Sequence, residues 1–255
     1  MSNAIRRFNR FELKYLLSWE AAEQLKQYLQ RYLQPDAHGD RNGTYVLSSL
    51  YYDTADQRFY WEKVEGIKFR RKLRIRHYEG QAALTAESKV FVEIKQRLER
   101  VIQKRRVLLP YRDALRLCNH RIIPHHAPRD RAVIEEIYAM VWQYNLRPAC
   151  ITSYMRQAFV GSDYDIGLRV TFDTNICYRA RDLQLHSKKI GPFMLSPQRV
   201  IMEIKVNERV PYWITELVAE HNFALIRISK YCTSLEAAAR VPKPSYHIGG
   251  KPWTK

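Results

Sequence analysis

Apolar and polar residues alternate along many stretches of this chain, with the period of two that is typical of strands having one buried and one accessible face. The predicted strands cover residues 7–17, 44–53, 67–78, 90–98, 100–109, 149–161, 166–179, 199–207 and 224–229. Apolar residues instead recur at helical spacing after Ser18, at Ala22, Leu25 and Leu29, which predicts a helix over residues 18–33 with Ser18 as its cap. Further helices are expected over residues 110–144, from Pro211 and over residues 233–240.

Three of the predicted strands carry a glutamate two residues before a lysine, so both charges point to one face and their apolar neighbours to the other. The three units are Glu12–Lys14, Glu93–Lys95 and Glu203–Lys205. Because the opposite faces are uniformly apolar, the charged faces of these strands are expected to line a common interior. This pattern predicts an α+β fold, a closed antiparallel barrel of eight strands with flanking helices, holding a ligand.

Further cations and one more carboxylate extend this charged face. If the strands converge, the cations that meet are Lys14, Arg74, Arg76, Lys95, Arg97, Arg156, Arg169, Lys205 and Arg227. The carboxylates are Glu12, Glu93, Asp173 and Glu203. So many cations would repel one another strongly unless an anionic ligand lay among them, and a polyphosphate with a divalent metal satisfies that requirement.

The composition limits the kind of partner and the compartment. A net charge of +17 indicates a polyanionic partner, namely nucleic acid, an anionic membrane or phosphate-rich small molecules. Glutamates interleaved with the lysines argue against simple nucleic-acid binding, and none is expected. The four separated cysteines are interpreted as reduced core thiols, and no signal peptide or apolar span is evident, so we expect a soluble, cytoplasmic protein.

Several short motifs, in order along the chain, give a family resemblance. They are Ser49-Leu50-Tyr51-Tyr52-Asp53-Thr54, Arg74-Ile75-Arg76, Arg169-Val170-Thr171-Phe172-Asp173-Thr174, Glu203-Ile204-Lys205 and Ser229-Lys230-Tyr231. With the Glu-x-Lys strands they resemble the VTC domain, the polyphosphate polymerase domain of the vacuolar transporter chaperone complex, in the triphosphate tunnel metalloenzyme superfamily. The resemblance covers residues 7–235. We therefore expect one domain over residues 5–240, followed by a tail over residues 241–255.

The resemblance implies a phosphotransferase that adds the terminal phosphoryl group of ATP, or of another triphosphate, to a polyphosphate chain. The residues it assigns to phosphate binding are Lys14, Arg74, Arg76, Lys95, Arg156, Arg169, Arg227, Ser229 and Lys230. Arg97 and Lys205 join them from the charged face. We expect the catalytic set to be Lys14, Arg74, Arg76, Lys95 and Glu203. The resemblance implies that Glu203 is a ligand of a divalent metal, Mn²⁺ or Mg²⁺. Glu12 and Glu93 are further candidate ligands of that metal.

The sequence departs from the family pattern at two positions. Hydrolytic relatives begin with Glu-x-Glu-x-Lys, but Arg10 stands at the first of these glutamates, which favours the polymerase branch. Arg227 stands where the family has a phosphate-binding lysine. The sensor domain and membrane helices of the eukaryotic polymerase subunits have no counterpart in this sequence, so any membrane partner would be a separate protein.

Two other functions remain open at this level. The same tunnel could hydrolyse its substrate, as a tripolyphosphatase or nucleoside triphosphatase, if water reaches the reacting phosphate. The chain could also be a non-catalytic module that binds polyphosphate or another polyanion. For Glu203, the alternative to metal binding is a structural ion pair with Lys205 or an arginine.

Overall fold

The structure is a computed structural model that describes residues 11–79, 83–99, 101–161, 165, 167–187, 189–207 and 209–241. Its strands are β1 (Phe11–Ser18), β2 (Leu33–Pro35), β3 (Thr44–Asp53), β4 (Phe69–Glu79), β5 (Lys89–Leu98), β6 (Val101–Pro110), β7 (Arg147–Gly161), β8 (Arg169–Arg179) and β9 (Arg199–Val206). Its helices are α1 (Trp19–Leu29), α2 (Arg58–Val64), α3 (Tyr111–His120), the short 3₁₀ turn η1 (Pro128–Asp130), α4 (Arg131–Gln143), α5 (Tyr212–Glu220) and α6 (Lys230–Ala237). Arg10 and residues 242–255 of the predicted tail lie outside the described residues.

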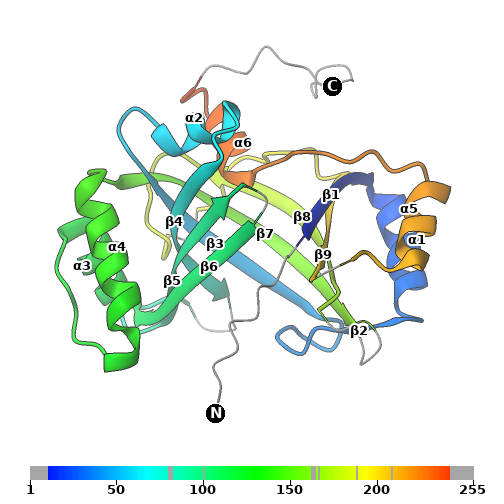
Figure 1. The fold of residues 1–255 in the computed structure, drawn as a ribbon, viewed down its shortest axis with the longest axis horizontal. Coiled ribbons are helices and arrows are strands. Elements are labelled where there is room, and N and C mark those ends of the chain that lie inside the picture. Colours follow the sequence, from blue (N-terminus) through cyan, green and yellow to red (C-terminus); the bar gives the residue numbers. More distant parts are fainter. Residues whose placement is uncertain are drawn as a thin grey trace.

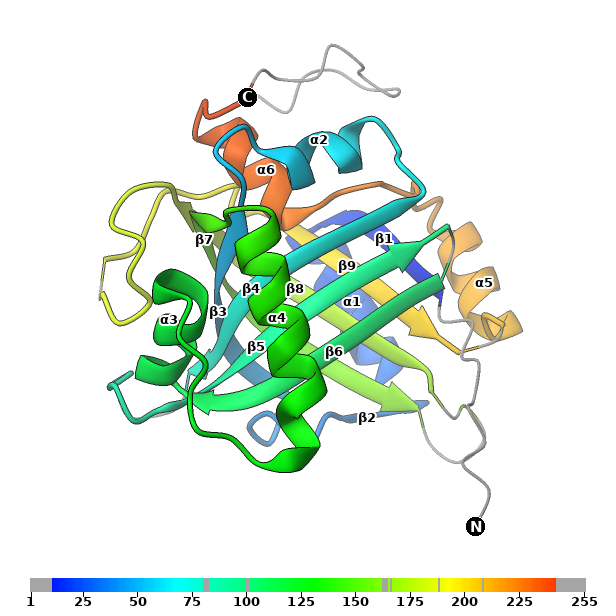
Figure 2. The same cartoon turned by 60° about the vertical axis from the view of Figure 1, so that its left-hand side comes forward.

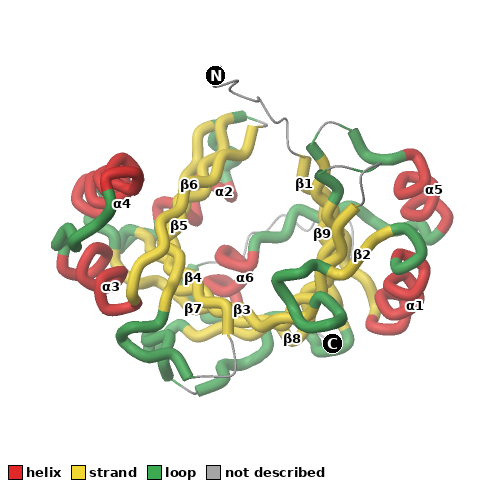
Figure 3. The backbone as a smooth tube through the Cα atoms, turned by 90° about the horizontal axis from the view of Figure 1, so that it is seen from below, coloured by secondary structure: helices red, strands yellow, loops and turns green. Residues whose placement is uncertain are grey.

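The strands form one antiparallel sheet in the order β1-β9-β8-β7-β3-β4-β5-β6, with β2 added beside β7. Seen along its axis, the sheet has the outline of a letter C whose two tips are β1 and β6 (Figure 3). Within the described part of the chain no ladder joins those two strands, so the prediction of a closed barrel is wrong. Alternation predicts the face that each side chain takes, but closure depends on strand tilt and stagger, which alternation does not determine.

Helices cover the convex face of this trough in two separate groups (Figures 1 and 2). On one side, Ile137 of α4 packs in the same buried cluster as Ile94 of β5. On the other side, Leu25 of α1 and Ile214 of α5 pack with Ile204 of β9. Each such buried side chain contributes roughly 1.5–3 kcal/mol, so the apolar strand faces turn outward to the helices and the charged faces turn inward.

Two β-bulges interrupt the strands in the middle of the sheet. One lies between Tyr51 and Tyr52, where β3 pairs with β7, and the other between Ser153 and Met155, where β7 pairs with β8. A bulge bends its strand and increases the local twist. These two irregularities therefore lie in the curved back wall of the trough, opposite its open side.

The helical region predicted over residues 110–144 is two helices. Helix α3 ends at His120, and Arg121 takes a left-handed conformation with φ of 58°. Pro124 and Pro128 then prevent a continuous helix, because proline lacks the N–H that a helix interior needs.

The strand predicted over residues 224–229 is also absent among the described residues. In place of a ladder, an isolated bridge between Tyr15 and Leu225 and a 2.8 Å hydrogen bond from Ile226 N to Lys14 O join the backbone of this segment to β1. The last helix begins earlier than predicted, because Ser229 caps α6 and accepts a hydrogen bond from the N–H of Cys232. Lys230 is therefore the first helical residue.

Cys118, Cys150, Cys177 and Cys232 are all buried and free, which confirms their interpretation as reduced core thiols. A separate finding concerns the helices: none of those described is long and apolar enough to cross a membrane.

Asp53, at the end of β3, joins α2 to α6. Its Oδ1 accepts hydrogen bonds from the N–H groups of Thr54 (2.7 Å) and Phe59 (2.9 Å), and its Oδ2 accepts from the N–H of Tyr60 (3.2 Å). The hydroxyl of Tyr231 in α6 donates to the same Oδ2. Phe59 and Tyr60 are buried, and the shared carboxylate fixes both helices at one end of the trough.

We expect Tyr231→Phe to lower the free energy of unfolding by about 1–3 kcal/mol, because the buried carboxylate of Asp53 would lose its side-chain donor. Urea denaturation measures the change. Tyr212→Phe is the matched control, since Tyr212 is 76% exposed, and it should stay within about 0.5 kcal/mol of the parent. Equal stability of the two variants would contradict this role for Tyr231.

Candidate phosphate-binding site

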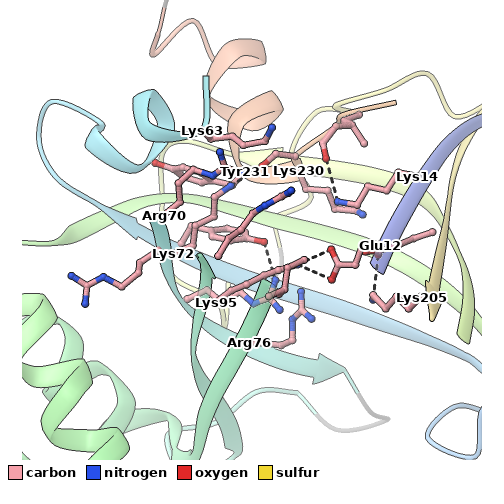
Figure 4. Close-up of a pocket in the computed structure, with 18 of the residues that line it drawn as sticks. Glu12, Lys14, Lys63, Arg70, Lys72, Arg76, Lys95, Lys205, Lys230 and Tyr231 are labelled. Carbon is pink, nitrogen blue, oxygen red and sulfur yellow. Dashed lines mark hydrogen bonds and ion pairs between the residues drawn. The ribbon is translucent and has the colours of Figure 1, made fainter. Parts of the chain in front are cut away.

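A pocket of about 200 Å³ lies on the concave face of the trough, at the end where α2 and α6 lie (Figure 4). Twelve lysine and arginine side chains line it, with only two carboxylates, Glu12 and Glu203. The cations are Lys14, Lys63, Arg70, Arg71, Lys72, Arg74, Arg76, Lys95, Arg97, Arg156, Lys205 and Lys230. The lining therefore carries a large excess of positive charge.

Arg74 is held in place by a carboxylate behind it. Its Nε and Nη2 donate to Oε2 of Glu93 at 2.8 and 2.6 Å, and its Nη1 donates to the hydroxyl of Tyr51 at 3.0 Å. Lys104 lies 3.4 Å from the other oxygen of Glu93. Burial opposes ionisation of Glu93, but Arg74, with other nearby cations, lowers its pKa to about 2. Glu93 is thus an ionised support for two cations.

Tyr51 and Arg76 lie beside this group. Burial favours the neutral phenol, but the cations Arg74, Arg76 and Lys72 lower the pKa of Tyr51 to about 8. Arg76 donates from Nε to Ser49 Oγ (3.1 Å) and from Nη2 to the hydroxyl of Tyr154 (3.1 Å). Its Nη1 has no protein acceptor among the described residues, so Arg76 keeps donors for a ligand.

A second buried carboxylate, Asp173, supports the opposite wall. Arg156 makes a bidentate pair with it, Nε to Oδ1 at 2.6 Å and Nη2 to Oδ2 at 2.7 Å, and Lys230 pairs with Oδ2. Burial would raise the pKa of Asp173, but Arg156 and Lys230 lower it to about 2. Each supporting carboxylate therefore holds two cations.

Glu203 and Glu12 face the pocket from the adjacent strands β9 and β1. Glu203 lies 3.3 Å from Lys205 and 3.7 Å from Arg156. Burial opposes ionisation of Glu203, yet Lys205 and its other cationic neighbours hold its pKa well below the usual range. Burial also lowers the pKa of Lys205 to about 7, against the attraction of Glu203. Both oxygens of Glu12 accept from Lys95 Nζ at 2.9 Å.

The segment leading into α6 completes the pocket wall. Lys14 Nζ donates to the carbonyl of Ile228 at 3.2 Å, and Lys72 Nζ donates to Ser229 Oγ at 2.8 Å. Lys14 comes from β1 and Lys72 from β4, on opposite sides of the trough. Residues far apart in the sequence are thus brought together by this one segment.

Most of the residues predicted from sequence line this pocket. They are Glu12, Lys14, Arg74, Arg76, Lys95, Arg97, Arg156, Glu203, Lys205, Ser229 and Lys230. Four do not: Glu93 lies behind Arg74, Asp173 lies behind Arg156, Arg169 pairs with Asp36 and with the hydroxyl of Tyr45, and Arg227 is exposed. Phosphate binding by Arg169 and Arg227 remains a prediction.

Sequence reasoning missed several residues of the lining: Tyr51, Lys63, Arg70, Arg71, Lys72, Tyr154 and Tyr231. Arg70 and Lys72 have the same strand parity as Arg74, and Tyr154 has that of Arg156, so alternation was a usable signal for them. Lys63 belongs to α2, and no local pattern indicates that this helix would lie over the sheet.

The residues present suit a metal that is bound together with phosphate. In the described part of the chain no three acidic, histidine or cysteine side chains form a complete metal site. Mg²⁺ commonly takes only one or two carboxylates, with phosphate oxygens and water as its other ligands. Glu203 and Glu12 can supply that number. Glu93 is excluded from our metal proposal because it lies behind Arg74 and does not line the pocket, whereas Glu203 and Glu12 do.

A curved antiparallel sheet whose inward lysines and arginines surround a pocket defines a protein class suited to binding a compact polyanion. A family model for the VTC domain matches residues 9–239, so the chain belongs to the VTC-domain family. No curated protein matches the chain.

Solved structures with a related arrangement are distant. A candidate adenylate cyclase from Bacillus halodurans is 14% identical, with a TM-score of 0.49, over 86% of this chain and 92% of its own. The PH1819 protein of Pyrococcus horikoshii is 12% identical, with a TM-score of 0.43, over 89% and 99%. The mimivirus capping enzyme triphosphatase is 7% identical, with a TM-score of 0.35, over 84% and 88%. Similarities this low carry no argument about activity.

We expect Asp173→Asn to lower the free energy of unfolding at pH 7 by about 3–5 kcal/mol, because Arg156 and Lys230 would be left as buried cations without a counter-charge. The folded pKa of Asp173, about 2, lies below the ordinary value of about 4. Its stabilisation is therefore present above about pH 4 and is lost as the pH falls toward 2.

Urea denaturation of parent and variant between pH 7 and pH 2 checks this prediction, and the difference between them should shrink on acidification. Glu135→Gln is the control, because it breaks an exposed pair with Arg131 and should change stability by less than about 1 kcal/mol. A parent and an Asp173 variant of equal stability at pH 7 would refute the supporting role.

Proposed function

We propose that this protein is a metal-dependent phosphotransferase of the polyphosphate polymerase type, which transfers the terminal phosphoryl group of ATP to a growing polyphosphate chain. The observation that carries the proposal is the lining of the pocket, twelve cations against two carboxylates, in a chain of the VTC-domain family. Phosphoryl transfer requires positioning and charge stabilisation more than covalent chemistry from the protein. Four buried free thiols support a cytoplasmic location as part of the same proposal.

The cations have different roles in this mechanism. Arg74 and Arg156 are rigid, because Glu93 and Asp173 hold them from behind, so they orient phosphate oxygens with little loss of side-chain freedom. Arg76 offers the donors that the protein leaves unpaired, and the lysines add point charge. Glu203 and Glu12 would hold Mg²⁺ or Mn²⁺, which when bound neutralises charge on the phosphate oxygens.

Hydrolysis is the second candidate, and one observation favours it. No strand ladder joins β1 to β6 among the described residues, so no backbone pairing excludes water from that side of the pocket. The same binding residues would then serve a tripolyphosphatase or nucleoside triphosphatase, with water in place of the growing chain as acceptor.

We expect Arg76→Ala to weaken tripolyphosphate binding by about 10- to 150-fold, which corresponds to the roughly 1.5–3 kcal/mol of a charge-assisted hydrogen bond. Arg181→Ala is the matched control, since it removes the same charge from an exposed residue outside the lining. It should change the Kd by less than about threefold. Titration calorimetry at constant salt measures both, and equal effects would contradict the role of Arg76.

The activity test is to incubate the protein with ATP and Mn²⁺ or Mg²⁺, then resolve phosphate chains on a gel and assay free phosphate. We expect long chains, lost on chelation of the metal and reduced by about 100-fold or more in Glu203→Gln. Glu136→Gln is the control, because Glu136 pairs with Arg105 outside the pocket lining. Circular dichroism checks that each variant is folded.

Free phosphate without chains would instead establish the hydrolase. If neither long chains nor free phosphate form but tripolyphosphate still binds tightly, the result would favour a non-catalytic polyanion-binding module.

A further inference from the structure

We propose that Tyr51 is a further phosphate-binding residue of the pocket, which donates its phenolic proton to an oxygen of the bound phosphate chain and must be neutral to do so. The inference rests on the proposed function in one respect, since it takes a phosphate chain as the ligand of the pocket. It adds an uncharged donor to the lysines and arginines of the lining, and it makes binding depend on the protonation of one side chain.

The hydroxyl of Tyr51 is fixed as an acceptor, which leaves its own proton without a partner. Arg74 Nη1 donates to the phenolic oxygen at 3.0 Å, and Arg74 Nη2 is held by Glu93 at 2.6 Å. The Tyr51 ring centroid lies 5.2 Å from that of Tyr231, and Tyr51 is 7% exposed. A phenol can accept and donate at once, yet no group in the described part of the chain accepts this proton. A buried donor of this kind in a pocket lining is available to a ligand.

Cations surround the Tyr51 hydroxyl, and a cation cannot accept its proton. They are Lys72, Arg74 and Arg76, all from β4 and all in the pocket lining. Lysine and arginine side chains carry donors only. A phosphate oxygen bound by the same cations would supply the missing acceptor, and hydrogen bonds from a hydroxyl to an anionic oxygen are short and strong.

Two possible acceptors on neighbouring strands are already engaged. Oε2 of Glu93, on β5, accepts both Nε and Nη2 of Arg74. The hydroxyl of Tyr154, on β7, accepts from Arg76 Nη2 at 3.1 Å. Neither is hydrogen-bonded to Tyr51 among the described contacts, so the protein does not compete with a ligand for the phenolic proton.

Tyr51 also differs from the other weak acids that are packed against it. Burial favours its neutral form, but Arg74 and the neighbouring cations lower the pKa of Tyr51 to about 8. Burial instead raises the pKa of the Tyr231 phenol of α6 and of the Cys150 thiol, which lies opposite Tyr51 on β7. A phenolate at Tyr51 has no proton to donate and would repel phosphate. Binding of phosphate should therefore return Tyr51 to its neutral form, with uptake of a proton from solvent.

The first test counts the protons that are taken up when tripolyphosphate binds. Titration calorimetry at about pH 8.5, in two buffers of different ionisation enthalpy, gives this number for the full-length parent and for Tyr51→Phe at constant salt and Mg²⁺. Tyr212→Phe is the matched control, because Tyr212 is 76% exposed and outside the lining. Lys205, whose pKa burial lowers to about 7, also gains a proton beside phosphate, and the comparison of parent with variant cancels that contribution.

We expect the parent and Tyr212→Phe to take up about half a proton or more per ligand beyond the uptake of Tyr51→Phe. Tyr51→Phe should also weaken binding by about 10- to 150-fold at about pH 6.5, the effect of one charge-assisted hydrogen bond. This difference in Kd should shrink as the pH rises above about 8, since the parent then loses the donor that the variant lacks.

An equal proton count in parent and Tyr51→Phe, with a loss of affinity that is the same at every pH, would show that Tyr51 acts only in packing. That result would overturn the inference and leave the proposed function intact. If the parent did not bind tripolyphosphate at all, the proposed function would fail together with the inference.

An ultraviolet difference spectrum gives a second test, which does not depend on whether a variant folds. The free parent at about pH 8.5 should show the absorption of a tyrosinate, and saturating tripolyphosphate should remove it. Tyrosinate absorption that persists in the complex would contradict donation by Tyr51. Circular dichroism checks that Tyr51→Phe is folded.

Discussion

Mutual repulsion among the cations of the pocket determines how the carboxylates around it must be placed. The lining brings a dozen positive side chains into one pocket, and the protein supplies few opposing charges there. Two buried carboxylates, Glu93 and Asp173, are placed behind the lining, and each is shared by two cations. This arrangement fixes the positions of the arginines without neutralising the surface that they present. The excess charge that remains is what an anionic ligand would compensate.

The chemistry of the pocket and the membership of the VTC-domain family lead to the same class of ligand by different routes. Electrostatics alone would accept any compact polyanion. The narrower choice comes from Glu203 and Glu12, which face the pocket as ionised carboxylates and would repel a ligand that brought no cation. Their presence among so many lysines and arginines favours a ligand that arrives as a metal complex.

Much of this site was predictable because strand alternation assigns faces reliably. Lys14, Arg74, Arg156 and Glu203 lie in the pocket for that reason. Closure of the sheet was not predictable, since no local pattern records whether the first and last strands meet. The place of Lys63 in the pocket was equally unpredictable, because α2 reaches the pocket only through tertiary packing.

The start of α6 shows a different limit of sequence reasoning. The cap formed by Ser229 is a local signal, but it was interpreted as the end of a strand. Once the helix starts there, Lys230 and Tyr231 turn toward Asp173 and Asp53. The exact start of this helix therefore decides where two pocket residues lie.

The two irregularities in the middle of the sheet have a mechanical consequence. One lies where β3 pairs with β7 and the other where β7 pairs with β8, so both belong to the back wall that joins the two sides. Each side is stiffened by its own hydrophobic cluster, one under α3 and α4 and the other under α1 and α5. The two sides thus resemble rigid plates, and the bend of the back wall contributes to the distance between them, together with the contacts that residues 228–231 make with both sides.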